Sequence, residues 1–206
     1  MNELELREQI AMHGKSLYER GYTCGSSGNI SVKLTDGILV TPTNCCLGRL
    51  EPDQISKVSW EGNHQSGGKP SKETFLHLAM YNSRPDEAAI VHLHSTYSVA
   101  VSCLKNIDPK NVLPAITAYY VMRVGQLPLV PYYAPGDMNL ARHVEKLASQ
   151  SRAMLLANHG PVIASQTLDQ AVYAMEELEE TAKLFLLLQN HEFNPLTESQ
   201  IADLKE

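Results

Sequence analysis

The chain has 206 residues, of which 43% are apolar and 19% are charged, as in an ordinary globular protein. This excludes collagen-like, low-complexity and wholly disordered chains, and the length predicts one domain spanning residues 1–206. Seventeen Lys and Arg stand against 23 Asp and Glu, a formal charge of −6, and the basic residues form no stripe that could follow a phosphate backbone, so we expect no nucleic-acid partner.

The N-terminus lacks the basic and apolar regions of a signal peptide, and no apolar run approaches the roughly 20 residues that cross a bilayer. We therefore expect a cytoplasmic protein with no membrane partner. The cysteines show no C-x-x-C spacing, which predicts that they are reduced, buried and structural. They are Cys24, Cys45, Cys46 and Cys103.

Three elements are predicted in the first half of the chain. Apolar residues at helical spacing indicate an amphipathic helix over residues 6–21. Alternating apolar and polar residues around Asp36-Gly37 predict a β-hairpin over residues 29–41. A second helix is expected to begin at Ser71, its N-cap, and to end at Arg84-Pro85.

Strands and helices alternate in the second half of the chain. A helix is expected to start at Pro135-Gly136-Asp137 with Asp137 as its N-cap, and residues 167–170 resemble a capping box that opens a long helix. This alternation without a linker predicts an α/β domain whose helices cover a central sheet. The other expected elements are a strand over residues 88–94, a helix over 95–104, an extended segment over 128–133, and strands over 153–157 and 162–164.

Three histidines are candidates for a metal site. His92 and His94 lie on one predicted strand, where residues i and i+2 project to the same face. His159 lies in the turn between two later strands, where a side chain can be presented at the end of the sheet. Three histidines and one open position describe a catalytic zinc site, in which the ion acts as a Lewis acid. The alternative is that they are ordinary half-buried histidines.

Polar residues elsewhere suggest an acid/base group and an anion site. Glu73, in the first turn of the second helix, is a candidate ligand or general acid/base, unless it is a surface residue. Gly25-Ser26-Ser27-Gly28-Asn29 offers hydroxyls and a backbone that can approach a phosphate, although such a composition also serves any loop. Thr41-Pro42-Thr43-Asn44 and Pro70-Ser71-Lys72 add hydroxyls, amides and one cation.

The order of these segments resembles the class II aldolase and adducin family over nearly the whole chain. The resemblance implies a three-layer α/β/α single domain with a central mixed, largely antiparallel sheet. It also implies a homotetramer with active sites at subunit boundaries. The matching segments are Gly28-Asn29-Ile30-Ser31, Thr41-Pro42-Thr43, Pro70-Ser71-x-Glu73 with His77, His92-Leu93-His94 and Asn158-His159-Gly160.

The resemblance also implies roles for individual residues. His92, His94 and His159 would bind one Zn²⁺ per subunit, with Glu73 as a further ligand and as the acid/base. Lys72 stands where the aldolases commonly have a small hydroxyl residue, so we expect the phosphate pocket, or the substrate end near it, to differ there. The remaining residues that would hold the phosphate are Ser27, Gly28, Asn29, Thr43, Asn44 and Ser71.

Further segments are similar to the 3-oxo-tetronate 4-phosphate decarboxylases of this family. That similarity implies zinc-dependent loss of CO₂ from a phosphorylated keto acid, 3-oxo-4-phospho-tetronate, through a metal-stabilised enediolate, giving dihydroxyacetone phosphate. Cleavage of a sugar phosphate such as fuculose 1-phosphate, or 4-epimerisation of ribulose 5-phosphate, stays open because the same enediolate chemistry serves them. A non-catalytic adducin-like scaffold is an alternative of another class. The segments include Thr41-Pro-Thr-x-x-Cys46-Leu-Gly, Lys69-Pro-Ser-Lys-Glu73, His92-Leu-His-Ser-Thr96 and Val130-Pro-Tyr-Tyr133.

Other residues have two interpretations each. The resemblance implies that a tyrosine near Tyr119 and Tyr120 enters the active site of a neighbouring subunit, and we assign Tyr120 to this role, with burial in an interface as the alternative. Arg123 would meet the substrate carboxylate or form a structural ion pair. The acidic cluster at 176–180 is interpreted as the solvated face of an amphipathic helix.

Overall fold

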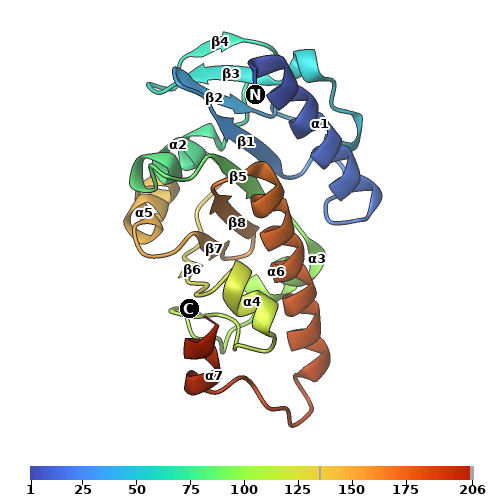
Figure 1. The fold of residues 1–206 in the computed structure, drawn as a ribbon, viewed down its shortest axis with the longest axis vertical. Helices are drawn as coiled ribbons and strands as arrows, with labels where there is room; N and C mark the ends of the chain where they lie inside the picture. The colour runs from blue at the N-terminus through green and yellow to red at the C-terminus, as the bar shows by residue number, and fades with distance from the viewer. Residues whose placement is uncertain (135, 205–206) are drawn as a thin grey trace.

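The computed structural model describes residues 1–134 and 136–204 and contains one eight-stranded sheet (Figure 1). The strand order is β4-β3-β2-β1-β5-β8-β7-β6, and every neighbouring pair is antiparallel except β6 and β7. The predicted mixed, largely antiparallel sheet is therefore confirmed. The strands are β1 Asn29–Lys33, β2 Gly37–Val40, β3 Ser56–Ser59, β4 His64–Ser66, β5 Ala89–His92, β6 Leu129–Val130, β7 Ala153–Leu156 and β8 Gly160–Ser165.

Helices cover both faces of the sheet and make the third layer. In Figure 1, α2 and α5 lie together on one side of the sheet, and α1, α3, α4 and α6 lie on the other. The helices are α1 Glu3–Glu19, α2 Thr74–Ser83, α3 Thr96–Ser102, α4 Ala118–Arg123, α5 Met138–Ala148, α6 Leu168–Leu188 and α7 Glu198–Asp203, with short 3₁₀ turns at Leu47–Arg49 and Pro52–Gln54.

The alternation of side chains along each strand divides the core in two. Leu39, Val91 and Ile163 pack with the helices α1, α3, α4 and α6, whereas their chain neighbours, such as Ile90 and Val162, pack with α2 and α5. Because successive residues of a strand point to opposite faces, a strand buried on both faces must be apolar throughout. This explains the continuous apolar segments of β5, β7 and β8, and it confirms the three-layer α/β/α architecture.

Most of the predicted elements are present. The hairpin around Asp36-Gly37 pairs β1 with β2, and the Asp137 side chain caps α5 by accepting from Asn139 N. Thr167 caps α6 in the same way, through Gln170 N. Pro135 and residues 205–206, which the predictions included, lie outside the described residues. The sequence analysis did not predict β3, β4, α4 or α7.

The start of α2 differs from the prediction, in which Ser71 was the N-cap. The helix begins at Thr74, and Glu73 occupies the cap position without a side-chain capping bond. Ser71 instead closes a preceding turn, because its hydroxyl accepts from Glu73 N at 3.2 Å and its carbonyl accepts from Thr74 N. Glu73 therefore precedes the helix and does not lie in its first turn, and its side chain is buried.

The prediction that the whole acidic cluster of α6 faces solvent is also wrong. Glu179 is buried, and its carboxylate accepts from Tyr97 N at 2.8 Å, Ser98 N at 2.8 Å and Ser98 Oγ at 2.7 Å. The main-chain donors in the first turn of a helix have no partner within the helix, and here the Glu179 carboxylate accepts from them. Glu179 therefore joins α6 to α3.

The cysteines form no disulfide among the described residues, as predicted, but they are not buried. Cys24 and Cys103 are exposed, and Cys45 and Cys46 are half-buried. Within the described ranges, no helix combines the length and the apolarity needed to cross a bilayer.

The contacts of Glu179 predict a large effect of its removal. Glu179→Ala leaves buried main-chain donors without an acceptor, which is expected to reduce the free energy of unfolding by about 2–4 kcal/mol. Glu180→Ala, one position along the same helix, removes only an exposed side chain 3.9 Å from Lys183 and should cost less than about 0.5 kcal/mol. Urea denaturation of both variants measures the difference, and equal stabilities would contradict this role of Glu179.

Candidate active site

The ends of two neighbouring strands bring the three histidines together. His92 is the last residue of β5 and pairs with Val162 of β8, and His159 immediately precedes β8. Asn158 has a φ of 55°, and a Cβ at Gly160 would lie 2.3 Å from Leu93 O. Only glycine allows the turn before β8 to approach the chain after β5 this closely. The close approach places His159 beside His94.

The imidazoles converge through their Nε2 atoms. His94 Nε2 lies 3.1 Å from His92 Nε2 and 3.1 Å from His159 Nε2. The Glu73 carboxylate completes the group, with Oε2 3.4 Å from His92 Nε2 and Oε1 3.1 Å from His159 Nε2. One ligand atom from each of the four residues lies within 4.8 Å of every other, the spacing of groups that share one metal ion.

Hydrogen bonds behind these side chains fix their orientation. His92 Nδ1 donates to Pro161 O at 2.8 Å, which leaves the lone pair of His92 on Nε2, facing the group. Asn29 Nδ2 donates to Glu73 Oε2 at 2.7 Å. Glu73 Oε1 is buried and accepts no hydrogen bond in the described part of the chain, although His159 Nε2 is near. A buried carboxylate oxygen without a donor is costly, and a cation would satisfy it.

Burial sets the protonation of the group. It lowers the pKa of His92 to about 4 and holds the pKa of His94 below its ordinary value. Burial by itself would raise the pKa of Glu73, but the neighbouring His92 and His159, with the donor Asn29, outweigh it, and that pKa is lowered. At neutral pH the site thus presents two neutral imidazoles and a carboxylate, which are the forms that bind a metal. The donor set fits a divalent cation.

A cavity of about 210 Å³ opens beside the four-residue group. Its lining includes every residue that the family resemblance assigned to phosphate binding, together with Glu73, His94 and His159. The residues from the phosphate assignment are Ser27, Gly28, Asn29, Thr43, Asn44, Ser71 and Lys72.

The loop before β1 lies against the end of β5. Gly28 has a φ of 81°, and a Cβ there would lie 2.9 Å from His92 O, so glycine is required for this approach. The side chain of Asn29 points to Glu73 and His77 and is hydrogen-bonded to both. Asn29 Oδ1 and one Nδ2 proton are therefore engaged, and the second Nδ2 proton and the main chain are what Asn29 can offer an anion in the cavity.

A second cavity, of about 530 Å³, adjoins His94 and His159 and is also lined by Tyr132 and Tyr133. These tyrosines belong to a segment that resembles the family, Val130-Pro-Tyr-Tyr133, but they were not predicted to lie at the site. No pattern in the sequence identifies them, because their place depends on the pairing of β6 with β7.

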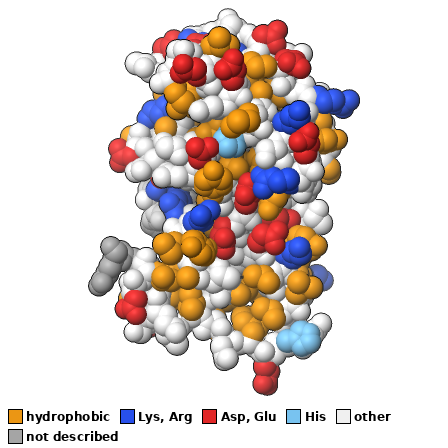
Figure 2. All heavy atoms as spheres, turned by 45° about the vertical axis from the view of Figure 1, so that its right-hand side comes forward, with side chains coloured by type: hydrophobic (Ala, Val, Ile, Leu, Met, Phe, Trp, Pro, Cys, Tyr) orange, Lys and Arg blue, Asp and Glu red, His pale blue; other side chains and the backbone are white. Residues whose placement is uncertain are grey.

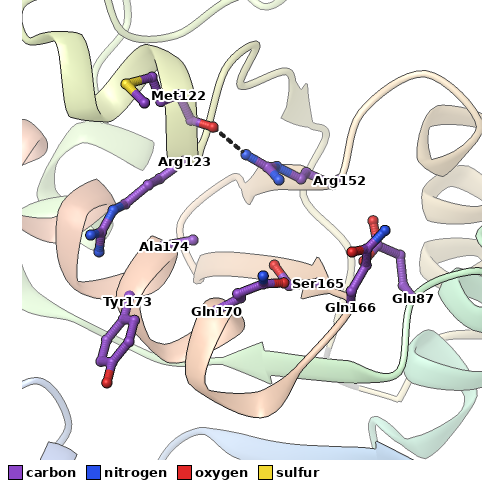
Figure 3. A pocket seen from close by; sticks show the side chains of 9 residues that line it. All are labelled: Glu87, Met122, Arg123, Arg152, Ser165, Gln166, Gln170, Tyr173 and Ala174. Atoms are coloured by element: carbon purple, nitrogen blue, oxygen red, sulfur yellow. Dashed lines mark hydrogen bonds between the residues drawn. The ribbon is translucent and has the colours of Figure 1, made fainter.

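Tyr120 and Arg123 lie away from the histidines. Tyr120 is 1% exposed in the core formed with α6, and it lines neither cavity described above. The Arg123 guanidinium lies over the rings of Tyr119, at 5.4 Å, and Tyr173, at 5.6 Å. Arg123 lines a separate cavity of about 390 Å³ with Arg152, near the last residue of β8 (Figure 3). That cavity is at the opposite end of the strand from His159.

Two known proteins are similar to this chain over most of its length. A 3-oxo-tetronate 4-phosphate decarboxylase of Escherichia coli strain K12 is 50% identical over 204 residues, which are 98% of this chain and 96% of that protein. An L-fuculose phosphate aldolase of Haemophilus influenzae is 34% identical over 191 residues, 91% of this chain and 85% of that protein.

The fold has close counterparts among solved structures. The crystal structure of YgbL from Escherichia coli superposes with a TM-score of 0.96 at 48% identity and covers 99% of each chain. The sequence profile of the class II aldolase and adducin N-terminal domain matches residues 8–186. The chain therefore belongs to the class II aldolase and adducin family.

Proposed function

We propose that this protein is a metal-dependent carboxy-lyase that converts 3-oxo-4-phospho-tetronate to dihydroxyacetone phosphate and CO₂. The observation that carries the proposal is the opening of the three-histidine and Glu73 group directly into the hydroxyl-rich cavity that contains Lys72. A metal site and an anion site thus share one space. The relatives that are about 50% identical over nearly their whole length supply the choice of substrate.

His92, His94, His159 and Glu73 would hold one divalent ion, with zinc as the expected metal because nitrogen ligands dominate. When bound, the ion supplies Lewis acidity towards the oxygen atoms of the substrate. Neutral imidazoles add no negative charge to the ion, so among these four ligands only the Glu73 carboxylate would offset part of its positive charge. The hydrogen bonds from His92 Nδ1 to Pro161 O and from Asn29 Nδ2 to Glu73 Oε2 keep these side chains in place.

The phosphate would lie in the 210 Å³ cavity. Ser71 Oγ accepts from Glu73 N, so its own proton can point to a phosphate oxygen, and Lys72 supplies a positive charge. The main chain at Gly28 and Asn29, and the residues Thr43 and Asn44, line the same space. Binding at this end would orient the bond from C1 to C2 for cleavage.

In the reaction, the bond from C1 to C2 breaks and CO₂ leaves, while its electron pair remains on C2 and C3 as an enediolate. A proton added at C2 completes dihydroxyacetone phosphate. Because the pKa of Glu73 is lowered, this carboxylate holds no proton at neutral pH. We therefore assign Glu73 to orienting a water molecule that donates to C2.

The 530 Å³ cavity would hold the departing carboxylate. The side chains that line it include two tyrosines and Val99, and among the described residues it has no Lys or Arg. A cation there would stabilise the carboxylate of the substrate more than neutral CO₂ and so would slow its departure. This composition favours decarboxylation. Arg123 does not line this cavity, and we therefore do not assign it to the substrate carboxylate.

We further propose that the protein acts in tetronate catabolism, in the cytoplasm, as a homotetramer. Apolar side chains gather on the lower half of the face shown in Figure 2. Exposed apolar residues of α3, α4 and α6 include Tyr97, Tyr119, Met122, Tyr173 and Leu187, which suit contacts between subunits. Tyr119, at 59% exposed, is better placed than the buried Tyr120 to reach a neighbouring active site.

The metal assignment predicts that His94→Ala lowers the bound metal from about one ion per chain to near zero, because loss of one of three imidazoles opens the site. Elemental analysis of the purified variants measures this. His64→Ala is the matched control, since His64 is exposed on β4, and it should keep the wild-type metal content. Equal metal content in the two variants would remove the assignment.

The substrate assignment is tested by offering the metal-loaded protein the keto acid phosphate and fuculose 1-phosphate separately. The expected products are CO₂ and dihydroxyacetone phosphate from the first and no lactaldehyde from the second. Lactaldehyde from the sugar phosphate, with CO₂ only at the spontaneous rate, would instead identify an aldolase. A protein that binds no metal and is inactive on both compounds, and on ribulose 5-phosphate, would favour the scaffold.

The buried neutral histidines predict a pH dependence for the metal-free protein. Burial lowers the pKa of His77 to about 3 and of His92 to about 4, from 6.5. Below about pH 6.5 the unfolded chain binds protons that the folded chain excludes, so stability falls by up to about 1.4 kcal/mol per pH unit for each group. Urea denaturation at about pH 7, 6 and 5 measures the slope. A constant stability over this range would contradict the burial of neutral imidazoles.

A further inference from the structure

A line of buried polar side chains extends from Glu73 away from the cavity. Its members come from two elements. Glu73 and His77 are four residues apart at the start of α2, and Tyr81 lies one turn further along the helix. Asn29 and Ser31 are two residues apart on β1. These spacings put each set on one face of its element. The two faces meet in the interior between α2 and the sheet.

The contacts between them are short and continuous. Asn29 Nδ2 donates to Glu73 Oε2 at 2.7 Å, and Asn29 Oδ1 lies 2.5 Å from His77 Nε2. His77 Nδ1 lies 2.6 Å from Ser31 Oγ, which lies 2.9 Å from the hydroxyl of Tyr81. His77 and Ser31 are fully buried, so water does not replace these contacts.

Only one direction of donation satisfies every member of this line. The ionised Glu73 can only accept, so Asn29 presents its NH₂ group to Glu73 and its carbonyl oxygen to His77. His77 must therefore carry its proton on Nε2 and accept at Nδ1 from Ser31. Because the Ser31 hydroxyl donates its hydrogen bond to His77 Nδ1, it accepts one from the Tyr81 hydroxyl.

The charge state of His77 agrees with this arrangement. Burial lowers the pKa of His77 to about 3, so the imidazole is neutral and carries one proton. A neutral imidazole has two tautomers, and its hydrogen-bond partners decide between them. In the other tautomer, the Nε2 lone pair would face Asn29 Oδ1, and two acceptors would repel each other. Asn29 would then turn its oxygen towards the Glu73 carboxylate.

We propose that His77 is a positioning residue for the active site, which it does not touch: through its Nε2 proton it holds the Asn29 amide in the orientation that orders Glu73. Ser31 and, more weakly, Tyr81 select the tautomer of His77. This inference rests on the proposed function, because Glu73 is ordered for the metal and for the reaction at C2.

Two amide variants separate this role from a merely structural one. A glutamine at 77 can place its NH₂ group where His77 Nε2 lies, whereas an asparagine, one methylene shorter, can replace only Nδ1. His77→Asn is expected to raise the dissociation constant for Zn²⁺ about 10-fold and to lower kcat about 10- to 100-fold. His77→Gln should stay within about threefold of wild type for both.

The KM for the keto acid phosphate should change little in either variant, since the phosphate end of the cavity is untouched. Ser31→Ala should fall between the two His77 variants, and Tyr81→Phe should be milder, because Ser31 can still donate to His77. His13→Leu is the control for loss of a buried histidine, because His13 pairs with Asp169 on α6 and lies outside this line. Zinc affinity is measured by competition with a chelator, and thermal unfolding verifies the fold.

The outcomes separate the inference from the proposed function. If the wild type binds Zn²⁺ and is active, and His77→Asn and His77→Gln have the same Zn²⁺ affinity and the same kcat, the positioning role alone is overturned. If His77→Asn does not fold, Ser31→Ala decides, and wild-type values for it would overturn the role. A wild-type protein that neither binds Zn²⁺ nor decarboxylates the keto acid would end both proposals.

Discussion

The burial of the Glu73 carboxylate among three imidazoles is the constraint on which the site depends. Removal of a carboxylate from water costs several kcal/mol unless donors or a cation replace its hydration. Here Asn29 replaces one part of that hydration, and Glu73 Oε1 is left facing the histidines. No donor faces Glu73 Oε1 among the described residues, so the group is electrostatically incomplete without a cation. This incompleteness is what makes the site suited to a metal.

The sheet creates this situation through the order of its central strands. β1, β5 and β8 are neighbours, and the register pairs Asn29 with His92 and His92 with Val162. Asn29, which donates to Glu73, therefore lies beside His92, and the turn before β8 places His159 next to them. α2 lies on the face of the sheet that it shares with α5. Because α2 begins at Thr74, the residue before it, Glu73, lies beside the histidines. The four side chains come from separate segments of the chain, so no single segment could bring them together.

The sequence allowed the local features of the site to be predicted, and the nonlocal ones less well. The spacing of His92 and His94 predicted their approach, although the strand predicted over residues 88–94, β5, ends at His92 and does not reach His94. The hairpin at 29–41 followed from its turn. Ser71 was wrong as the N-cap because it closes a turn that precedes α2, and the helix begins only at Thr74. Glu179 was assigned to solvent because helical periodicity does not show the amides of α3 that approach it. The partners of Asn29 depend on strand register, which one sequence does not reveal.

Polar edge strands and loops were also beyond prediction. β4 is exposed along its length, so it carries no apolar alternation to indicate a strand. Tyr132 and Tyr133 become part of the site only because β6 pairs in parallel with β7, an arrangement that leaves no periodic pattern in the chain.

Anomalous diffraction at the zinc absorption edge, from crystals of the protein purified with zinc, tests the central claim most directly. The account predicts one strong peak among the Nε2 atoms of His92, His94 and His159, at about 2.0–2.1 Å from each, with a Glu73 oxygen beside it. A well-ordered site with no peak, or zinc bound only elsewhere on the chain, would contradict it.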